Sequence, residues 1–177
     1  MHPRTRELLT YLQEQRTVLR EAFDEVPPQL RERALARGRW SAANVIEHLA
    51  IVETRIAGRL SNAIADARDA GVAAESTADA VLPSLNVRRV LDRTTRVNAP
   101  DAVQPTGFTA DEAWAALESA TGKVRDALHA GDGLALGTLT LPHPVFGPQS
   151  LYDWFGFIGA HEARHASQIR EIVSELR

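Results

Sequence analysis

The sequence predicts an all-α protein folded as a four-helix bundle with one long crossover. Four segments of two or more turns carry apolar residues at helical spacing, and a proline-punctuated stretch at residues 71–108 separates the second segment from the third. The chain has 177 residues and no cysteine. A chain of this length can bury a core without disulfides, so we expect residues 1–177 to form a single domain.

The first predicted helix covers residues 3–23, where Leu8, Leu12 and Leu19 recur on one face and Arg, Glu and Gln fill the other. The pair Pro27-Pro28 cannot continue a helix, so the helix should end near residue 24. A short helical turn is expected within residues 29–36.

The second predicted helix begins after Ser41, a residue type that caps helix N-termini, and ends near residues 70–71. His48 lies beside its apolar stripe. The stripe consists of Val45, Leu49, Val52, Ile56 and Leu60.

The crossover at residues 71–108 is too long for a tight turn, and in a compact domain such a segment is usually functional. Within it, we predict a short helix over residues 86–96. A cluster of guanidinium groups on this helix can receive a carboxylate or a phosphate of a substrate. The alternative is a solvated face partly paired with Asp92. The arginines of this segment are Arg88, Arg89, Arg93 and Arg96.

The third predicted helix starts at a capping-box sequence from Thr109 to Glu112 and ends at the glycines of residues 131–133. Apolar and polar residues alternate weakly over residues 137–141, which predicts a strand-like piece. The prolines of residues 142–148 predict an irregular loop. A second capping sequence at residues 150–153 introduces the last helix, which runs to the C-terminus.

The strongest functional signal is the pair His161 and His165 in the last predicted helix. Residues four apart share one face of a helix, so the two imidazoles can close on one ion. Both continue an otherwise apolar stripe that includes Trp154, Ile158 and Ile172. A pair of buried core histidines held by hydrogen bonds is the alternative.

A third histidine on an apolar helix face, His48, favours a metal site over that alternative. Three neutral nitrogen ligands with one open position are typical of catalytic zinc and related centres. We therefore predict that His48, His161 and His165 bind a divalent metal. Zinc and nickel are our first choices, although imidazole nitrogen also suits cobalt, copper and iron.

Three sequence pieces resemble the DinB superfamily, which includes the YfiT-like metal-dependent hydrolases and several low-molecular-weight thiol transferases. They are Trp40-Ser41 followed by Glu47-His48-Leu49, then His143-Pro144-Val145-Phe146-Gly147, and finally His161-Glu162-Ala163-Arg164-His165-Ala166-Ser167-Gln168-Ile169. The resemblance spans most of the chain. It implies that the three histidines are the metal triad, that the bundle is up-down-down-up with its crossover between helices 2 and 3, and that the protein is a homodimer.

An open metal site could activate water or a substrate thiol. The chain has no cysteine nucleophile and no serine in a recognised elbow motif. Glu162 and Glu47 are the candidate proton acceptors beside the triad. Glu162 could instead orient an imidazole, and Glu47 could be plain helix surface. His143 could reach the site or face solvent, and a fourth metal ligand could come from Glu47, Glu162, Asp153 or His143.

The sequence favours a metal-dependent transferase or hydrolase acting on a small molecule, for which a low-molecular-weight thiol is one candidate. A non-catalytic, stress-associated metal-binding protein and a helical dimerisation module are the alternatives. The net charge of −3, with charges interspersed, indicates no general attraction to nucleic acid or anionic membranes. The N-terminus has no apolar signal segment, so we expect a soluble, cytoplasmic protein.

Overall fold

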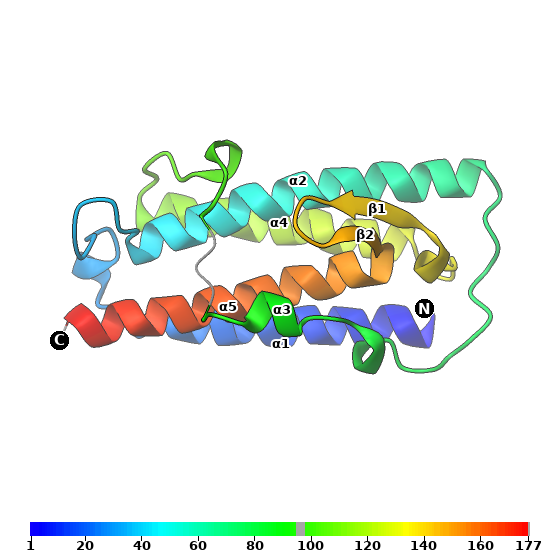
Figure 1. Cartoon of the computed structure of the whole chain (residues 1–177), viewed down its shortest axis with the longest axis horizontal. Helices are drawn as coiled ribbons and strands as arrows, with labels where there is room; N and C mark the ends of the chain where they lie inside the picture. Colours follow the sequence, from blue (N-terminus) through cyan, green and yellow to red (C-terminus); the bar gives the residue numbers. More distant parts are fainter. Residues whose placement is uncertain (95–97, 177) are drawn as a thin grey trace.

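A computed structural model of the chain describes residues 1–94 and 98–176. Four long helices lie side by side and form the predicted bundle (Figure 1). Helices α1 and α5 run in one direction and pack against each other, while α2 and α4 run in the opposite direction as a second pair. This arrangement is the up-down-down-up bundle. The helices are α1 (Pro3–Asp24), α2 (Ala42–Asp69), α4 (Ala110–Ala130) and α5 (Leu151–Leu176).

The predicted caps are confirmed at the starts of α2, α4 and α5. The hydroxyl of Ser41 accepts from the Asn44 amide at 3.1 Å, and the Asn44 side chain accepts from the Ser41 amide at the same distance. Thr109 and Glu112 make the same reciprocal pair before α4. Each pair satisfies amide donors that have no partner within the helix, which is why these helices begin where the sequence indicates.

The crossover between α2 and α4 is confirmed, but its helix is shorter than residues 86–96. Helix α3 covers only Arg88–Leu91, with single 3-10 turns at Leu82–Ser84 and Asp101–Val103. The Asp92 carboxylate accepts from the Thr94 amide at 2.9 Å. Such a local turn competes with helix hydrogen bonding and ends α3. Arg96, which we had placed on the same helix, lies outside the described residues.

The prediction of an irregular loop at residues 142–148 is wrong. Strands β1 (Thr140–His143) and β2 (Gly147–Ser150) form an antiparallel hairpin in which Pro142 pairs with Pro148. A two-stranded hairpin tolerates proline because each strand has an unpaired edge. The preceding residues 136–138 form a 3-10 turn, so the strand begins later than residue 137.

The core consists of two apolar clusters at opposite ends of the bundle. One surrounds Phe23 and Trp114, and the other surrounds Phe155 and Leu128. Between them lies a layer of buried and half-buried polar side chains from four helices. The layer consists of Arg16, Glu53, Thr121 and Glu162.

No helix among residues 1–94 and 98–176 is long and apolar enough to cross a membrane.

Candidate metal centre

Helices α2 and α5 bring the three predicted ligands together. One ring nitrogen from each of His48, His161 and His165 lies within 4.8 Å of the others. The ring centroids are 4.5 Å apart for His161 and His165, and 5.1 and 5.3 Å apart for the pairs that include His48. A small cation can therefore reach all three imidazoles after small side-chain rotations.

Two of the imidazoles are held in a defined tautomer by their neighbours. His48 donates from Nδ1 to the Val103 carbonyl oxygen at 2.8 Å, and His165 donates from Nδ1 to Oε1 of Gln168 at 2.8 Å. Each bond places the proton on Nδ1 and leaves the lone pair of Nε2 available. Partners of this kind orient metal-ligating histidines in known sites.

The third imidazole, His161, contacts His165 through the Nε2 atom that would bind a metal. Its Nε2 lies 3.0 Å from Nε2 of His165, so without a metal the two atoms share one proton in a hydrogen bond. Since His165 presents a lone pair there, His161 is the donor. A cation would replace this proton.

Burial keeps the triad neutral. It lowers the pKa of His48, it lowers that of His161 well below the ordinary value, and it lowers the pKa of His165 to about 3. The neighbouring imidazoles and Arg164 add to the effect on His161 and His165. Neutral imidazole is the form that binds a metal, so the site is ready for a cation at neutral pH.

The donor set fits a divalent metal with an open position. Among the described residues, the three histidines are the one group of His, Cys, Asp or Glu side chains placed closely enough to hold an ion. None of the four candidates for a fourth ligand belongs to that group; they are Glu47, Glu162, Asp153 and His143. Three nitrogen ligands are one fewer than a closed structural zinc site requires.

Aromatic rings and the crossover enclose the triad. Trp40 packs on His48 with ring centroids 4.9 Å apart, and Phe157 stacks on His161 at 5.1 Å with an interplanar angle of 19°. Arg164 donates to the carbonyl oxygens of Val90 and Asp92, which ties the crossover to α5. The site therefore lies between two helices, under a segment that is distant in sequence.

The sequence profile of the DinB superfamily matches residues 11–169, which include all three histidines. The chain belongs to the DinB superfamily. The crystal structure of TT2238, a four-helix bundle protein, is similar in fold, with a TM-score of 0.58 and 22% sequence identity. That likeness covers 94% of this chain and 98% of TT2238.

A curated relative, the uncharacterized protein YuaE of Bacillus subtilis (strain 168), is 50% identical over 36 residues. This match covers 20% of this chain and 22% of YuaE. The chain thus aligns with less than a quarter of that relative's length.

The structure places Glu47 next to the crossover rather than in the group of ligands. Its carboxylate accepts from the backbone amides of Thr106, Gly107 and Phe108, and from the Thr106 hydroxyl, at 2.6–3.0 Å. Burial raises its pKa, but these bonds outweigh burial and hold the pKa below the ordinary value. Glu47 is thus an ionised anchor for the segment that carries Val103.

The structure places Glu162 in the polar layer of the core. Its Oε1 accepts from Nη2 of Arg16 at 2.5 Å, and the same nitrogen donates to Glu53 at 3.0 Å. Burial, and then the neighbouring Glu53 carboxylate, raise the pKa of Glu162 well above its ordinary value.

Two arginines of the predicted cluster contact different parts of the molecule. Arg93 donates to Glu171 of α5 and to the Arg164 carbonyl oxygen. Arg89 lies over the Phe146 ring, 5.0 Å from its centroid, and Arg88 is exposed. Arg93 is already paired with the carboxylate of Glu171. Arg88 and Arg89 are therefore the described arginines of this segment that an anion could bind.

Gln168 and Val103 hydrogen-bond to two imidazoles of the triad, a role that the sequence analysis did not assign to either residue. Gln168 could have been found, since it lies three residues after His165 and therefore on the same side of α5. Val103 acts through its backbone carbonyl, which carries no sequence signal.

Proposed function

We propose that the protein is a metal-dependent transferase or hydrolase that acts on a small thiol, thioether or ester-like substrate. The observation that supports this proposal is the buried triad of His48, His161 and His165, with two Nε2 lone pairs presented and no fourth protein ligand among the described residues. A divalent metal supplies Lewis acidity, which makes water or a thiol nucleophilic near neutral pH.

The chain's own residues orient and shield this site. Val103 and Gln168 hold the proton of His48 and His165 on Nδ1, so that both Nε2 atoms face the centre. Trp40 and Phe157 cover two of the imidazoles and limit the access of bulk water. A shielded site strengthens electrostatic interactions with a bound substrate.

The proposal predicts one divalent metal per chain. Protein purified without an affinity tag should contain metal by elemental analysis, and calorimetric titration of zinc into the metal-free protein should show about one site. His161→Ala should remove measurable binding, whereas His129→Ala, an exposed histidine on α4, should leave it unchanged. Equal affinity of His161→Ala and the wild type would disprove the site.

Turnover is the second test. The metal-loaded protein should react with a panel of thiols and electrophilic acceptors, or with simple esters and amides, and His165→Ala should lose that activity. Metal binding without triad-dependent turnover on either panel would favour a non-catalytic metal-binding protein.

Metal removal should leave the bundle folded. The two apolar clusters hold all four helices together and do not include the triad. Circular dichroism should therefore show the same helical signal before and after treatment with a chelator at room temperature. Loss of the signal would show that the metal is structural.

The metal-free protein should lose stability as the pH falls below about 6.5, the ordinary imidazole value. His48 and His165 have lowered pKa values in the folded state and stay neutral, while the unfolded chain takes up protons. Below about pH 6.5, each such imidazole should therefore lower the free energy of unfolding by about 1.4 kcal/mol for every pH unit of acidification, as long as it stays neutral in the folded state. Urea unfolding at several pH values measures this slope. His165→Leu should have a shallower slope than the wild type, and an equal slope would contradict the assignment.

A further inference from the structure

A narrow cavity lies between α1 and α4, where the two helix pairs of the bundle meet less closely than the helices within each pair. Gln13 of α1 and Arg125 of α4 are exposed at its mouth, and its inner end is the polar layer. Its apolar wall consists of Leu12, Val124 and Ile158. The volume open to the centre of a water-sized molecule is about 20 Å³, which is room for one water.

Two polar side chains at the inner end of this cavity have unpaired atoms. Nε and Nη1 of Arg16 and Oε2 of Glu162 are buried, and no group among residues 1–94 and 98–176 forms a hydrogen bond with them. Arg16 is 9% exposed and Glu162 is 2% exposed. Buried polar groups almost always have a partner, because an unpaired group loses its hydration without compensation. These three atoms therefore indicate a ligand in the cavity that both side chains line.

The hydrogen bonds of Arg16 are unevenly distributed over its nitrogens. Nη2 carries two hydrogen atoms, yet it faces both carboxylate oxygens of Glu53, at 3.0 and 3.3 Å, together with oxygens of Thr121 and Glu162. Nη1 and Nε carry three hydrogen atoms between them and donate to no described group. The acceptors of the polar layer are thus gathered around one nitrogen, so the other two need an acceptor from outside the layer.

The ligand that fits these atoms must accept from Arg16 and also pair with Glu162. An anion would accept from Arg16 but would be repelled by the carboxylates of Glu53 and Glu162. A cation would satisfy Oε2 of Glu162 but would be repelled by the guanidinium. Water is neutral, both accepts and donates hydrogen bonds, and has the size of the cavity. It can also pair with Oε2 in the ionised and in the protonated carboxyl group.

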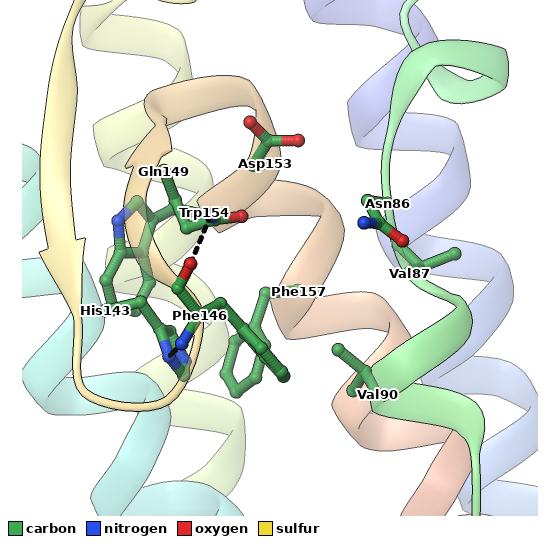
Figure 2. A pocket seen from close by; sticks show the side chains of 9 residues that line it. All are labelled: Asn86, Val87, Val90, His143, Phe146, Gln149, Asp153, Trp154 and Phe157. Carbon is green, nitrogen blue, oxygen red and sulfur yellow. Dashed lines mark hydrogen bonds between the residues drawn. The ribbon is translucent and has the colours of Figure 1, made fainter.

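A cavity between the crossover and the start of α5 provides a contrast (Figure 2). It also has room for about one water, and Phe146, Trp154 and Phe157 are among the residues that line it. Gln149 in its wall donates to the Phe146 carbonyl oxygen at 3.2 Å. Its lining residues carry no buried polar atom without a partner in the described part of the chain. Space for a water is thus present at both cavities, but unpaired polar atoms distinguish the one at the polar layer.

We propose that the cavity between α1 and α4 binds one water molecule that accepts from Nε or Nη1 of Arg16 and hydrogen-bonds to Oε2 of Glu162. This water site does not include the triad and does not rest on the proposed function. Since the mouth of the cavity is at the surface, the water exchanges with bulk solvent while the bundle stays folded. The ion pairs of the polar layer are therefore hydrated from the seam between α1 and α4.

A high-resolution crystal structure of the full chain tests the site directly. Density for one water is expected in the cavity, within about 3.2 Å of Oε2 of Glu162 and of Nε or Nη1 of Arg16. The inference is overturned if Nε and Nη1 instead donate directly to the carboxylates and no water lies in the cavity. Soaks in sodium bromide and in rubidium chloride distinguish water from an ion. An anomalous peak in the cavity from bromide or rubidium would likewise overturn the inference.

Nuclear magnetic resonance tests the same site in solution. In the ¹⁵N-labelled protein, the Nε–H of Arg16 should show a nuclear Overhauser effect to the water signal, as expected for a water held beside it. The hydroxyl of Thr121, to which Arg16 also donates, exchanges its proton with solvent and would transmit a similar signal. Thr121→Val removes this hydroxyl and keeps the shape of the side chain, so the effect should persist in that variant. Loss of the effect in Thr121→Val would contradict a bound water.

Filling the cavity should remove the water. Val124→Ile adds one methylene group to the wall, and should abolish both the water density and the Overhauser effect of Arg16. Val173→Ile is the matched control, because Val173 is a buried valine that does not line the cavity, so both signals should remain. An Overhauser effect that persists in Val124→Ile would place the water elsewhere and overturn the inference. The wild-type density and the Thr121→Val result decide the question even where Val124→Ile does not fold.

Discussion

Arg16→Leu should lower the free energy of unfolding by about 3–5 kcal/mol, which is the usual cost of removing one partner from a buried ion pair. A domain of this kind has a total stability of about 5–15 kcal/mol, so the loss should be evident in urea unfolding. The effect should exceed that of replacing any exposed charge on α1.

The reason is the position of the guanidinium between two buried carboxylates. Nη2 of Arg16 donates to Glu53 at 3.0 Å and to Glu162 at 2.5 Å, and the three side chains lie between the two apolar clusters. Both carboxylates are about 2% exposed or less. Without Arg16 they would face each other with no cation, in an environment that disfavours charge.

Two comparisons check this explanation. Arg20→Ala removes an exposed arginine that pairs with Asp24 and lies over the Trp114 ring, and should cost about 1 kcal/mol or less. Replacing Arg16, Glu53 and Glu162 together by leucine should recover most of the loss, because no unpaired charge remains. A triple variant as unstable as Arg16→Leu would show that packing, and not charge, causes the loss.

The cost of Arg16→Leu should also decrease as the pH falls. In the wild type the charge of Arg16 opposes the rise that burial causes in the pKa of Glu53 and of Glu162, so its removal should raise both pKa values further, and the folded variant then takes up protons before the unfolded chain does. Protonation removes the unpaired charge and restores part of the stability between neutral pH and the ordinary carboxyl value of about 4.3.

The four helices and the triad could be predicted because their signals are local. Apolar spacing defines each helix, and the caps at Ser41 and Thr109 mark two of the starts. The same apolar stripes carry His48 and His165, so their burial follows from their positions in the stripes. Short-range spacing alone therefore indicates which imidazoles share the interior of the bundle.

The polar layer also had a local signal, although the sequence analysis placed the arginines of the first helix on its polar face without singling out Arg16. Arg16 lies four residues after Leu12 and three before Leu19, so it belongs to the apolar stripe. Glu53 has the same relation to Leu49 and Ile56. A charge inside an apolar stripe predicts burial, but the partner that makes burial tolerable comes from another helix.

The crossover contacts could not be predicted, because they depend on backbone groups that are distant in sequence. His48 is held by the carbonyl of Val103, and Glu47 by the amides of residues 106–108. Any residue except proline offers an amide, and every residue offers a carbonyl. The hairpin was missed for a related reason, since proline argues against strands only where both edges are paired.

Glu47→Ala should lower the free energy of unfolding by about 1–3 kcal/mol, since it removes the charged acceptor of three crossover amides. It should also weaken metal binding roughly tenfold to a hundredfold, the usual effect of losing a group that orients a ligand. The second effect is expected because residues 106–108 follow closely after Val103, which holds the proton of His48 on Nδ1. Release of this part of the crossover would free the His48 ring.

Urea unfolding of the metal-free protein measures the first effect of Glu47→Ala, and competition with a chromophoric chelator measures the second. Asp66→Ala serves as the control, since Asp66 is an exposed carboxylate on the same helix and should change neither quantity appreciably. Glu47→Gln keeps one acceptor oxygen but turns an amino group toward the backbone amides, so it should fall between wild type and alanine. Reduced stability with unchanged metal affinity would show that Val103 holds His48 independently of Glu47. Reduced affinity in both Glu47 variants, in the order of their stability loss, would instead show that the carboxylate maintains the metal site through the crossover.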